Sequence, residues 1–160
     1  ISGVVEAVNF NSPGQVVVAG ESKAVNKACE SMKEAGAKRA LVLPVSVPSH
    51  CSLMNNAAQE FSYSVNAVHF KMGETSVLHN IDASYADDTN EIKLKLVEQL
   101  YKPVLWTSSV QKMQQLGVEK LIELGPGKVL AGLTRRIDKS LSSLAVIDMT
   151  TVQSTIEEIS

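Results

Sequence analysis

Two apolar, β-branched runs near the start of the chain are separated only by Ser12, Pro13 and Gly14. Proline presets φ for a turn, and glycine accepts a positive φ without steric cost. Residues 3–11 and 15–19 are therefore predicted to be two strands that pair antiparallel across this turn. Whatever fold the chain adopts must include this hairpin.

A helix and a third strand are predicted to follow the hairpin. Apolar side chains from Val25 to Met32 recur at i, i+3, i+4 and i+7, which is the spacing of one helical face. Ser22 is interpreted as the N-cap of this helix and Gly36 as the residue that ends it. Residues 38–45 return to a strand pattern. The result is a β-β-α-β unit, which needs more sheet to cover it.

The remaining residues alternate helical and strand patterns, in the style of an α/β protein with a parallel sheet. One helix is predicted to begin at Asp88, with Glu91 as its capping-box partner, and to end before Pro103. The other predicted helices are 53–61, 106–113, 129–137 and 152–159, and the predicted strands are 75–81, 120–124 and 143–147.

Composition excludes several classes of protein. The chain has 160 residues, 44% of them hydrophobic, which is enough for one ordinary domain with a buried core. Its formal net charge of −2 argues against a nucleic-acid partner, since such proteins concentrate Lys and Arg against phosphates. It has no apolar run near the ~20 residues that cross a bilayer, and no signal-peptide order at its start. We therefore expect a cytoplasmic protein without a membrane partner.

Few side chains are arranged for metal or thiol chemistry. Cys29 and Cys51 lie in unrelated patterns, so reduced thiols are expected rather than a disulfide. His69 and His79 lack a Cys or carboxylate at ligand spacing, so no metal is expected. Ser22 follows a strand as a nucleophile elbow would, but the elbow's last glycine is Ala24 here. Helix capping explains this serine better.

His50 is the strongest candidate for chemistry. It follows the run 40–47 and opens a helical pattern, a place from which an imidazole can project into a cleft. Its ordinary pKa suits proton transfer near neutral pH. From position alone, a structural histidine is as good an interpretation as a catalytic one. Cys51 is adjacent, but neighbouring side chains diverge, so a Cys-His pair is geometrically poor and a buried thiol is the better interpretation.

Three motifs resemble those of the bacterial malonyl-CoA:acyl-carrier-protein transacylases of type II fatty acid synthesis. They are VVEAVNFNSPGQ at 4–15, VSVPSHCSLM at 45–54 and ELGPGKVL at 123–130. The resemblance implies an α/β-hydrolase-like acyltransferase domain with a ferredoxin-like insert, of which this chain matches the C-terminal half. Residues 1–46 then form the later β-β-α-β part of the ferredoxin-like subdomain, and residues 47–160 the C-terminal part of the larger subdomain.

The resemblance also implies roles for five residues. His50 matches the general base of a double displacement through an acyl-serine. Gln99 matches the position whose backbone carbonyl orients that imidazole. Asn9, Asn11 and Gln15 match polar residues beside the bound acyl or pantetheine group. They are also residue types that suit a turn, which is the alternative explanation for their place beside Pro13-Gly14. Malonyl-CoA and the phosphopantetheinyl acyl carrier protein are the implied substrates, and no cofactor is implied.

The nucleophilic serine, the arginine for the malonyl carboxylate and the oxyanion-hole donors of that family are not found in this sequence. Since the first residue is Ile1, we expect a truncated or processed beginning. A fragment that is inactive alone is therefore predicted, its other half supplied by another chain or absent. The alternative is an interaction module that self-associates through its exposed core or binds the acidic carrier protein through Lys38, Arg39, Lys128, Arg135 and Arg136. A hydrolase using Cys51 is a third, weaker hypothesis.

Overall fold

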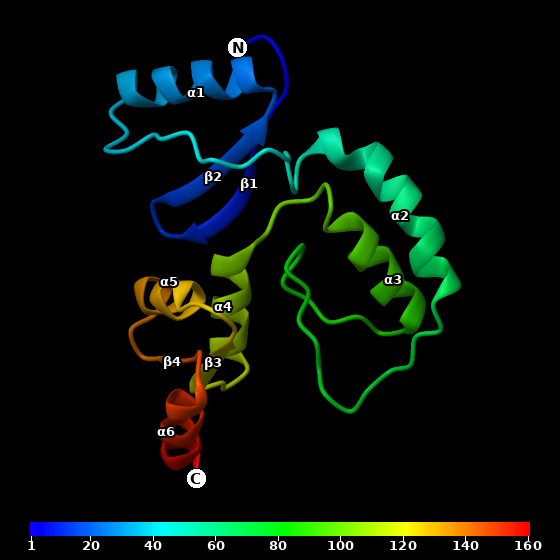
Figure 1. Cartoon of the computed structure of the whole chain (residues 1–160), viewed down its shortest axis with the longest axis vertical. Coiled ribbons are helices and arrows are strands. Elements are labelled where there is room, and N and C mark those ends of the chain that lie inside the picture. The colour runs from blue at the N-terminus through cyan, green and yellow to red at the C-terminus, as the bar shows by residue number, and fades with distance from the viewer.

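The computed structural model describes all of residues 1–160 as an α/β chain with two separate two-stranded sheets. Figure 1 shows the first sheet and α1 above α4, α5 and α6, with α2 and α3 to one side. In chain order the elements are β1 (Val5–Ser12), β2 (Gln15–Gly20), α1 (Ser22–Glu34), the 3-10 helix η1 (Ser52–Met54), α2 (Asn55–Ala67), α3 (Thr89–Glu98), α4 (Trp106–Gln115), β3 (Lys120–Leu124), α5 (Val129–Ile137), β4 (Ser142–Val146) and α6 (Met149–Ile159).

The predicted hairpin is confirmed. Strands β1 and β2 pair antiparallel, with Ser12 opposite Gln15 across the turn, and Gly14 has a φ of 77°. Such a left-handed conformation is one that glycine adopts without steric cost. Helix α1 follows and contacts both strands, burying Ala24, Ala28 and Cys29.

The interpretation of Ser22 as an N-cap is wrong. Ser22 is already the first helical residue of α1, while Glu21 holds the extended backbone of the cap position. The Glu21 side chain makes no hydrogen bond to the amides of the first turn. The helix begins one residue earlier than expected, directly after Gly20 and Glu21, so Ser22 lies inside its first turn.

The second sheet is parallel, as the alternating pattern predicts. Strands β3 and β4 run in register from Lys120 opposite Ser142 to Leu124 opposite Val146. Helix α5 makes the crossover between them and contacts both strands, and α6 contacts β4. The predicted strand at 120–124 is confirmed with the same bounds, and β4 begins one residue earlier than expected.

Two other predicted strands are not formed. Residues 38–45 and 75–81 are irregular, with one isolated bridge between His79 and Ser84. Both segments have the composition of a strand, but a strand requires a neighbour for its backbone hydrogen bonds. Neither segment pairs with a strand of this chain, so the backbone hydrogen bonds of a strand are not formed there.

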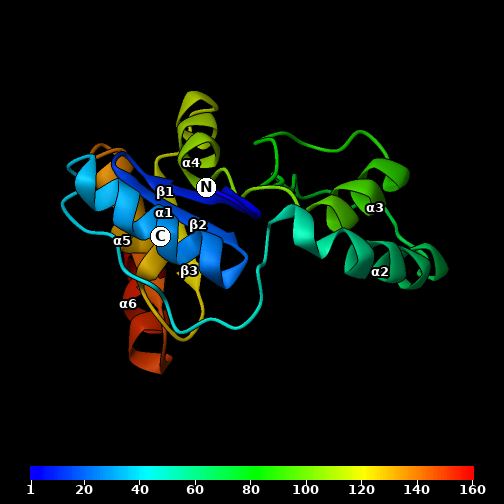
Figure 2. The ribbon, with the colours of Figure 1, turned by 90° about the horizontal axis from the view of Figure 1, so that it is seen from above.

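Helices α2 and α3 pack against each other and stand apart from the sheets (Figure 2). Asp88 caps α3 as predicted, since its carboxylate accepts from the amides of Asn90 and Glu91. The expected capping box is incomplete, because the Glu91 carboxylate accepts from the amide of Asp87 instead of Asp88. Pro103 lies in the segment between α3 and α4, consistent with a helix that ends before it.

The segment before α4 ties these parts together. Val104 exchanges backbone hydrogen bonds with β1, donating to the carbonyl of Val8 and accepting from the amide of Phe10. The amide of Leu105 donates to the carbonyl of Asn80. Val8 and Val110 are fully buried where α4 contacts β1. None of the helices combines the length and apolar character that a bilayer span demands.

Candidate active site

His50 lies in residues 48–52, which lead into α2 and are called the junction. Its backbone is in a strained conformation. Its φ is 65°, which is the left-handed region that non-glycine residues rarely adopt. Its amide donates to the carbonyl of Leu100, at 2.8 Å. Strained backbone of this kind persists where surrounding contacts over-determine it, and it is common at functional sites. The sequence contains no glycine here to signal it.

The His50 ring has one hydrogen-bond partner. Its Nδ1 lies 2.6 Å from the backbone carbonyl oxygen of Gln99. A carbonyl oxygen can only accept, so Nδ1 must carry the hydrogen of this bond. In the neutral ring this leaves Nε2 with a free lone pair. The pair that the family resemblance names is therefore in contact, and it leaves the outer ring nitrogen able to accept a proton.

Gln99 can offer its carbonyl because it stands at the end of a helix. It is the C-cap of α3, and the last carbonyls of a helix have no partner within the helix. The side chain of Lys95 anchors this helix: it is 5% exposed and forms ion pairs with Asp82 at 3.0 Å and Glu91 at 3.1 Å. The helix that presents the acceptor of the His50 ring is thus held by ion pairs of a buried lysine with two partly exposed carboxylates.

Sequence reasoning missed a second anchor of the junction, Glu6 of β1. One of its carboxylate oxygens accepts from the amide of Ser52 at 2.9 Å, and the other accepts from the Ser52 hydroxyl. These two hydrogen bonds, that of the hydroxyl most of all, hold the pKa of the Glu6 carboxyl below its usual range. A signal was present, because Glu6 is the one charged residue in the predicted strand 3–11.

Cys51 is fully buried next to His50. Burial raises the pKa of its thiol above the usual range, since a thiolate is costly away from water. Neither cysteine forms a disulfide. The structure thus gives Cys51 the properties of an inert core thiol and not those of a nucleophile, which needs access and a lowered pKa.

The three other predicted site residues lie on the hairpin and make no hydrogen bond to His50. Asn9 is opposite Val17 and also bridges to Val104. Asn11 is half-buried near the end of β1. The Gln15 side-chain oxygen accepts from Arg136 of α5 at 3.0 Å. Among the predicted site residues, only His50 and Gln99 are joined to each other by a hydrogen bond.

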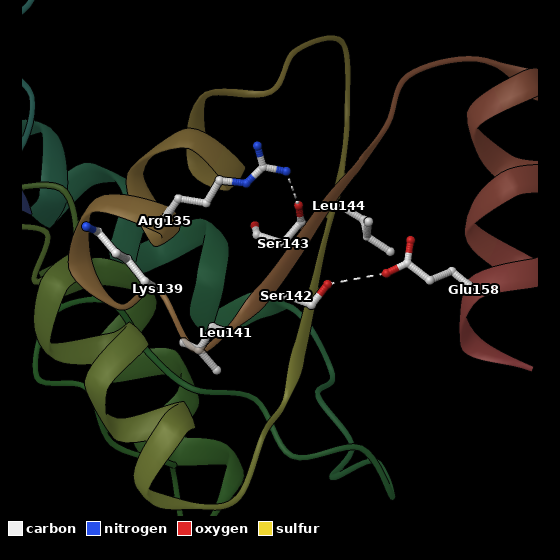
Figure 3. A pocket seen from close by; sticks show the side chains of 7 residues that line it. All are labelled: Arg135, Lys139, Leu141, Ser142, Ser143, Leu144 and Glu158. Atoms are coloured by element: carbon white, nitrogen blue, oxygen red, sulfur yellow. Dashed lines mark hydrogen bonds between the residues drawn. The ribbon is translucent and has the colours of Figure 1, made fainter.

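A hollow at the C-terminal end of the molecule contains none of the five residues to which the family resemblance assigns a role. Arg135 donates to the carbonyl of Ser143 there, and Ser142 reaches toward Glu158 (Figure 3). Two of its three charged side chains, Arg135 and Glu158, already have partners within the chain. No cluster of His, Cys, Asp and Glu suited to a metal ion exists in the chain. The site at His50 is thus the best-formed candidate.

The chain is similar in sequence or in structure to three known proteins. It is 53% identical over 146 residues to the malonyl CoA-acyl carrier protein transacylase of Haemophilus influenzae, covering 91% of this chain and 47% of that protein. The acyl carrier protein S-malonyltransferase of Vibrio cholerae is 52% identical, with a TM-score of 0.93 over 96% of this chain and 50% of that one. A malonyl-transacylase in complex with a type II PKS acyl-carrier protein has a TM-score of 0.95 and 46% identity, covering 98% and 50%.

No family model matches the chain. The α/β fold and the relatives nevertheless show that the chain is similar to one half of proteins of the acyltransferase type. It is a homologue of the bacterial malonyl CoA-acyl carrier protein transacylases, and the resemblance predicted from its three motifs is confirmed. The chain spans about half the length of the curated relatives it matches. The other half of those relatives is called the unmatched half below.

Proposed function

We propose that this chain supplies the general base of a malonyl transferase, which moves malonyl from CoA to the phosphopantetheine thiol of an acyl carrier protein. The observation that carries the proposal is the 2.6 Å contact between His50 Nδ1 and the Gln99 carbonyl. It fixes the ring orientation and the tautomer that a base requires. An orienting carbonyl takes the place of the acidic third member of a serine triad.

The reaction proceeds by two acyl transfers. His50 Nε2 takes the proton of a serine hydroxyl in the unmatched half as that oxygen attacks the malonyl thioester. The carbon–sulfur bond breaks, and the protonated ring gives its proton to the departing CoA thiolate. The carrier thiol then attacks the malonyl-serine ester, giving its proton to His50, which passes it to the serine oxygen. The C-terminal dipole of α3 at Gln99 stabilises the positive charge that the ring bears between these steps.

The substrate contacts on this chain are assigned to Asn9, Asn11 and Gln15, beside the acyl or pantetheine group. Similarity to a malonyl-transacylase solved with its acyl-carrier protein supports a carrier protein as the partner. The reaction needs no metal or organic cofactor, since acyl transfer proceeds through the serine ester. We place the protein in the cytoplasm, where no membrane or nucleic acid takes part.

The unmatched half is assigned the serine, the arginine for the malonyl carboxylate and the oxyanion-hole donors, so these 160 residues alone are inactive. We assign residues 1–46 to the ferredoxin-like subdomain and 47–160 to the α/β-hydrolase-like one. The exposed apolar run 41–47 supports this division, because it has a strand pattern but no strand beside it. In the completed protein it would pair within a larger sheet.

Reconstitution tests the proposal. The chain, with its mass verified, is assayed for malonyl transfer from CoA to a carrier protein, alone and with a separately produced unmatched half from a relative. We expect transfer only in the mixture, and none when the chain carries His50→Gln. Robust transfer by the verified chain alone would contradict the proposal.

A second candidate function is an inactive interaction module. It is favoured by the apolar side chains exposed over 41–47, among them Val42 and Val45, which are 60% and 67% exposed. A tight dimer that recovers no activity with the unmatched half would support it. The predicted basic patch gives it less support, because Arg135 and Arg136 are hydrogen-bonded within the chain. Full burial of Cys51 leaves a cysteine hydrolase without an accessible nucleophile.

A further inference from the structure

Glu6 connects two parts of the chain that are distant in sequence. It lies near the start of β1 and is half-buried. Both of its carboxylate oxygens are used by one residue, Ser52, through the backbone amide and the hydroxyl. Hydrogen bonds to an ionised carboxylate are roughly twice as strong as those between neutral groups. This pair is therefore a firm attachment between the hairpin and the segment after His50.

The attachment replaces a missing helix cap. Ser52 is the first residue of η1, which leads directly into α2, and the N-cap residue Cys51 makes no side-chain cap hydrogen bond. The first amides of a helix need acceptors, and a negative charge is favourable at this end. Glu6 supplies both from a different element. Local sequence around the helix start could not have revealed the cap, because it comes from β1.

His50 is held between two anchors. Its amide donates to the carbonyl of Leu100, and two residues further on the Ser52 amide donates to Glu6. The φ of 65° at His50 is costly for a non-glycine residue unless its flanks are fixed. If the Ser52 anchor is released, the backbone can relax and turn the ring away from the Gln99 carbonyl. A misplacement of about 1 Å can cost a hundredfold in rate.

We infer that Glu6 is a positioning residue for His50, acting through its two hydrogen bonds to Ser52. This inference rests on the proposed function, because it assumes that His50 is the base. Glu6 does not touch the ring, so its loss lowers kcat through misorientation of His50 and leaves KM nearly unchanged.

A matched control exists in the same chain. Glu123 of β3 also caps a helix from a strand, since its carboxylate accepts from the Ala131 amide of α5 at 2.8 Å. Glu123→Ala removes one capping hydrogen bond and Glu6→Ala removes two, but only Glu6 is linked to His50. In the reconstituted mixture we expect Glu6→Ala to lower kcat about tenfold or more, and Glu123→Ala to leave it within about twofold. Glu6→Gln, which keeps an acceptor for the Ser52 amide, restores most of the rate.

A second measurement does not depend on activity. The ¹⁵N signals of the His50 ring in the 160-residue chain report which nitrogen carries the hydrogen. Wild type and Glu123→Ala should show hydrogen on Nδ1 alone, and Glu6→Ala a mixture of the two tautomers. If Glu6→Ala does not fold, Ser52→Ala replaces it: it removes one of the two bonds, and about a threefold loss of kcat is expected.

The outcomes separate the two ideas. An active wild-type mixture in which Glu6→Ala and Glu123→Ala behave alike in kcat and in the ring signals would overturn the role of Glu6 and leave the proposed function standing. A wild-type mixture with no transfer would count against the proposed function, and the ring signals would still decide whether Glu6 orients His50.

Discussion

Two neighbouring stretches of irregular backbone differ sharply in how they are held. Residues 41–47 are largely exposed, and their few backbone hydrogen bonds are short-range, such as that from Val45 to Leu43. The junction that follows is bound to three distant positions, Leu100, Gln99 and Glu6. Residues 41–47 have the clearer strand pattern, yet they have fewer long-range hydrogen bonds than the junction. A strand pattern in the sequence does not form a strand when no neighbouring strand is present to pair with it.

The difference shows what this chain contributes by itself. The hydrogen bonds made by the His50 ring and amide are both to residues of this chain, so the ring is oriented without the unmatched half. The sheets are small by contrast, since β3 and β4 pair only with each other and residues 41–47 pair with no strand. The orientation of the proposed base is therefore present in this chain, while the groups on which it would act are assigned to the unmatched half.

The largest expected effect breaks the junction at its centre. His50→Ala in the reconstituted mixture should lower kcat by about 10²–10⁴-fold, the usual contribution of a general base. The control is His69→Ala, because His69 is exposed and lies away from the junction. Equal activity of the two variants would show that the junction is ordered for some other purpose.

A smaller effect is expected in the exposed stretch. If residues 41–47 join a sheet with the unmatched half, Leu43→Lys removes about 1.5–3 kcal/mol of apolar burial from that association. The concentration of unmatched half giving half-maximal activity should rise about tenfold or more, measured by titration. Leu94→Lys on α3 is the matched control, since Leu94 is 56% exposed and Leu43 53%. Identical titrations would mean that the stretch stays unpaired.

Acid should loosen the junction and leave the exposed stretch unchanged. The hydrogen bonds from the Ser52 hydroxyl and the Ser52 amide keep the pKa of the Glu6 carboxyl in the folded chain below its usual range. The stabilisation from these bonds is therefore fully present above the pKa of an unfolded glutamate and is lost as the pH falls through the lower pKa of the folded chain. Amide exchange should show Ser52 protected at neutral pH and progressively less so in acid, with 41–47 unprotected throughout. Glu6→Gln should abolish this step; a step that survives would point to another group.

The smallest effect concerns Cys51. Its burial and raised pKa predict very slow alkylation of the native chain, as slow as that of Cys29, which is 8% exposed. Mass analysis after treatment with iodoacetamide measures this. Fast modification of Cys51 alone would show that the junction opens readily and would revive the cysteine hypothesis.

Much of the fold could be predicted because its signals are local. The Pro13-Gly14 turn determines the hairpin, and Asp88 determines the start of α3. The parallel pair β3–β4 follows from strand and helix patterns in alternation. The contact between His50 and Gln99 was expected from family resemblance, since nothing in the spacing of these residues brings them together.

Two features escaped prediction because local sequence does not report contacts between distant residues. The strand expected at 38–45 has no partner strand in this chain, and the cap of η1 comes from Glu6, which is 46 residues away from Ser52. The cap assigned to Ser22 failed differently, by a shift of one position at a helix start. Local patterns determine elements but not the long-range contacts that complete them.

In our proposal this chain holds the base and the unmatched half holds the nucleophile. Intact mass analysis tests this division most directly: the two halves are mixed with malonyl-CoA, the reaction is quenched before any carrier protein is added, and the mass of each half is measured. We expect a malonyl adduct on the unmatched half, formed only when this chain is present and greatly reduced with His50→Ala. A malonyl adduct on this chain itself would contradict it.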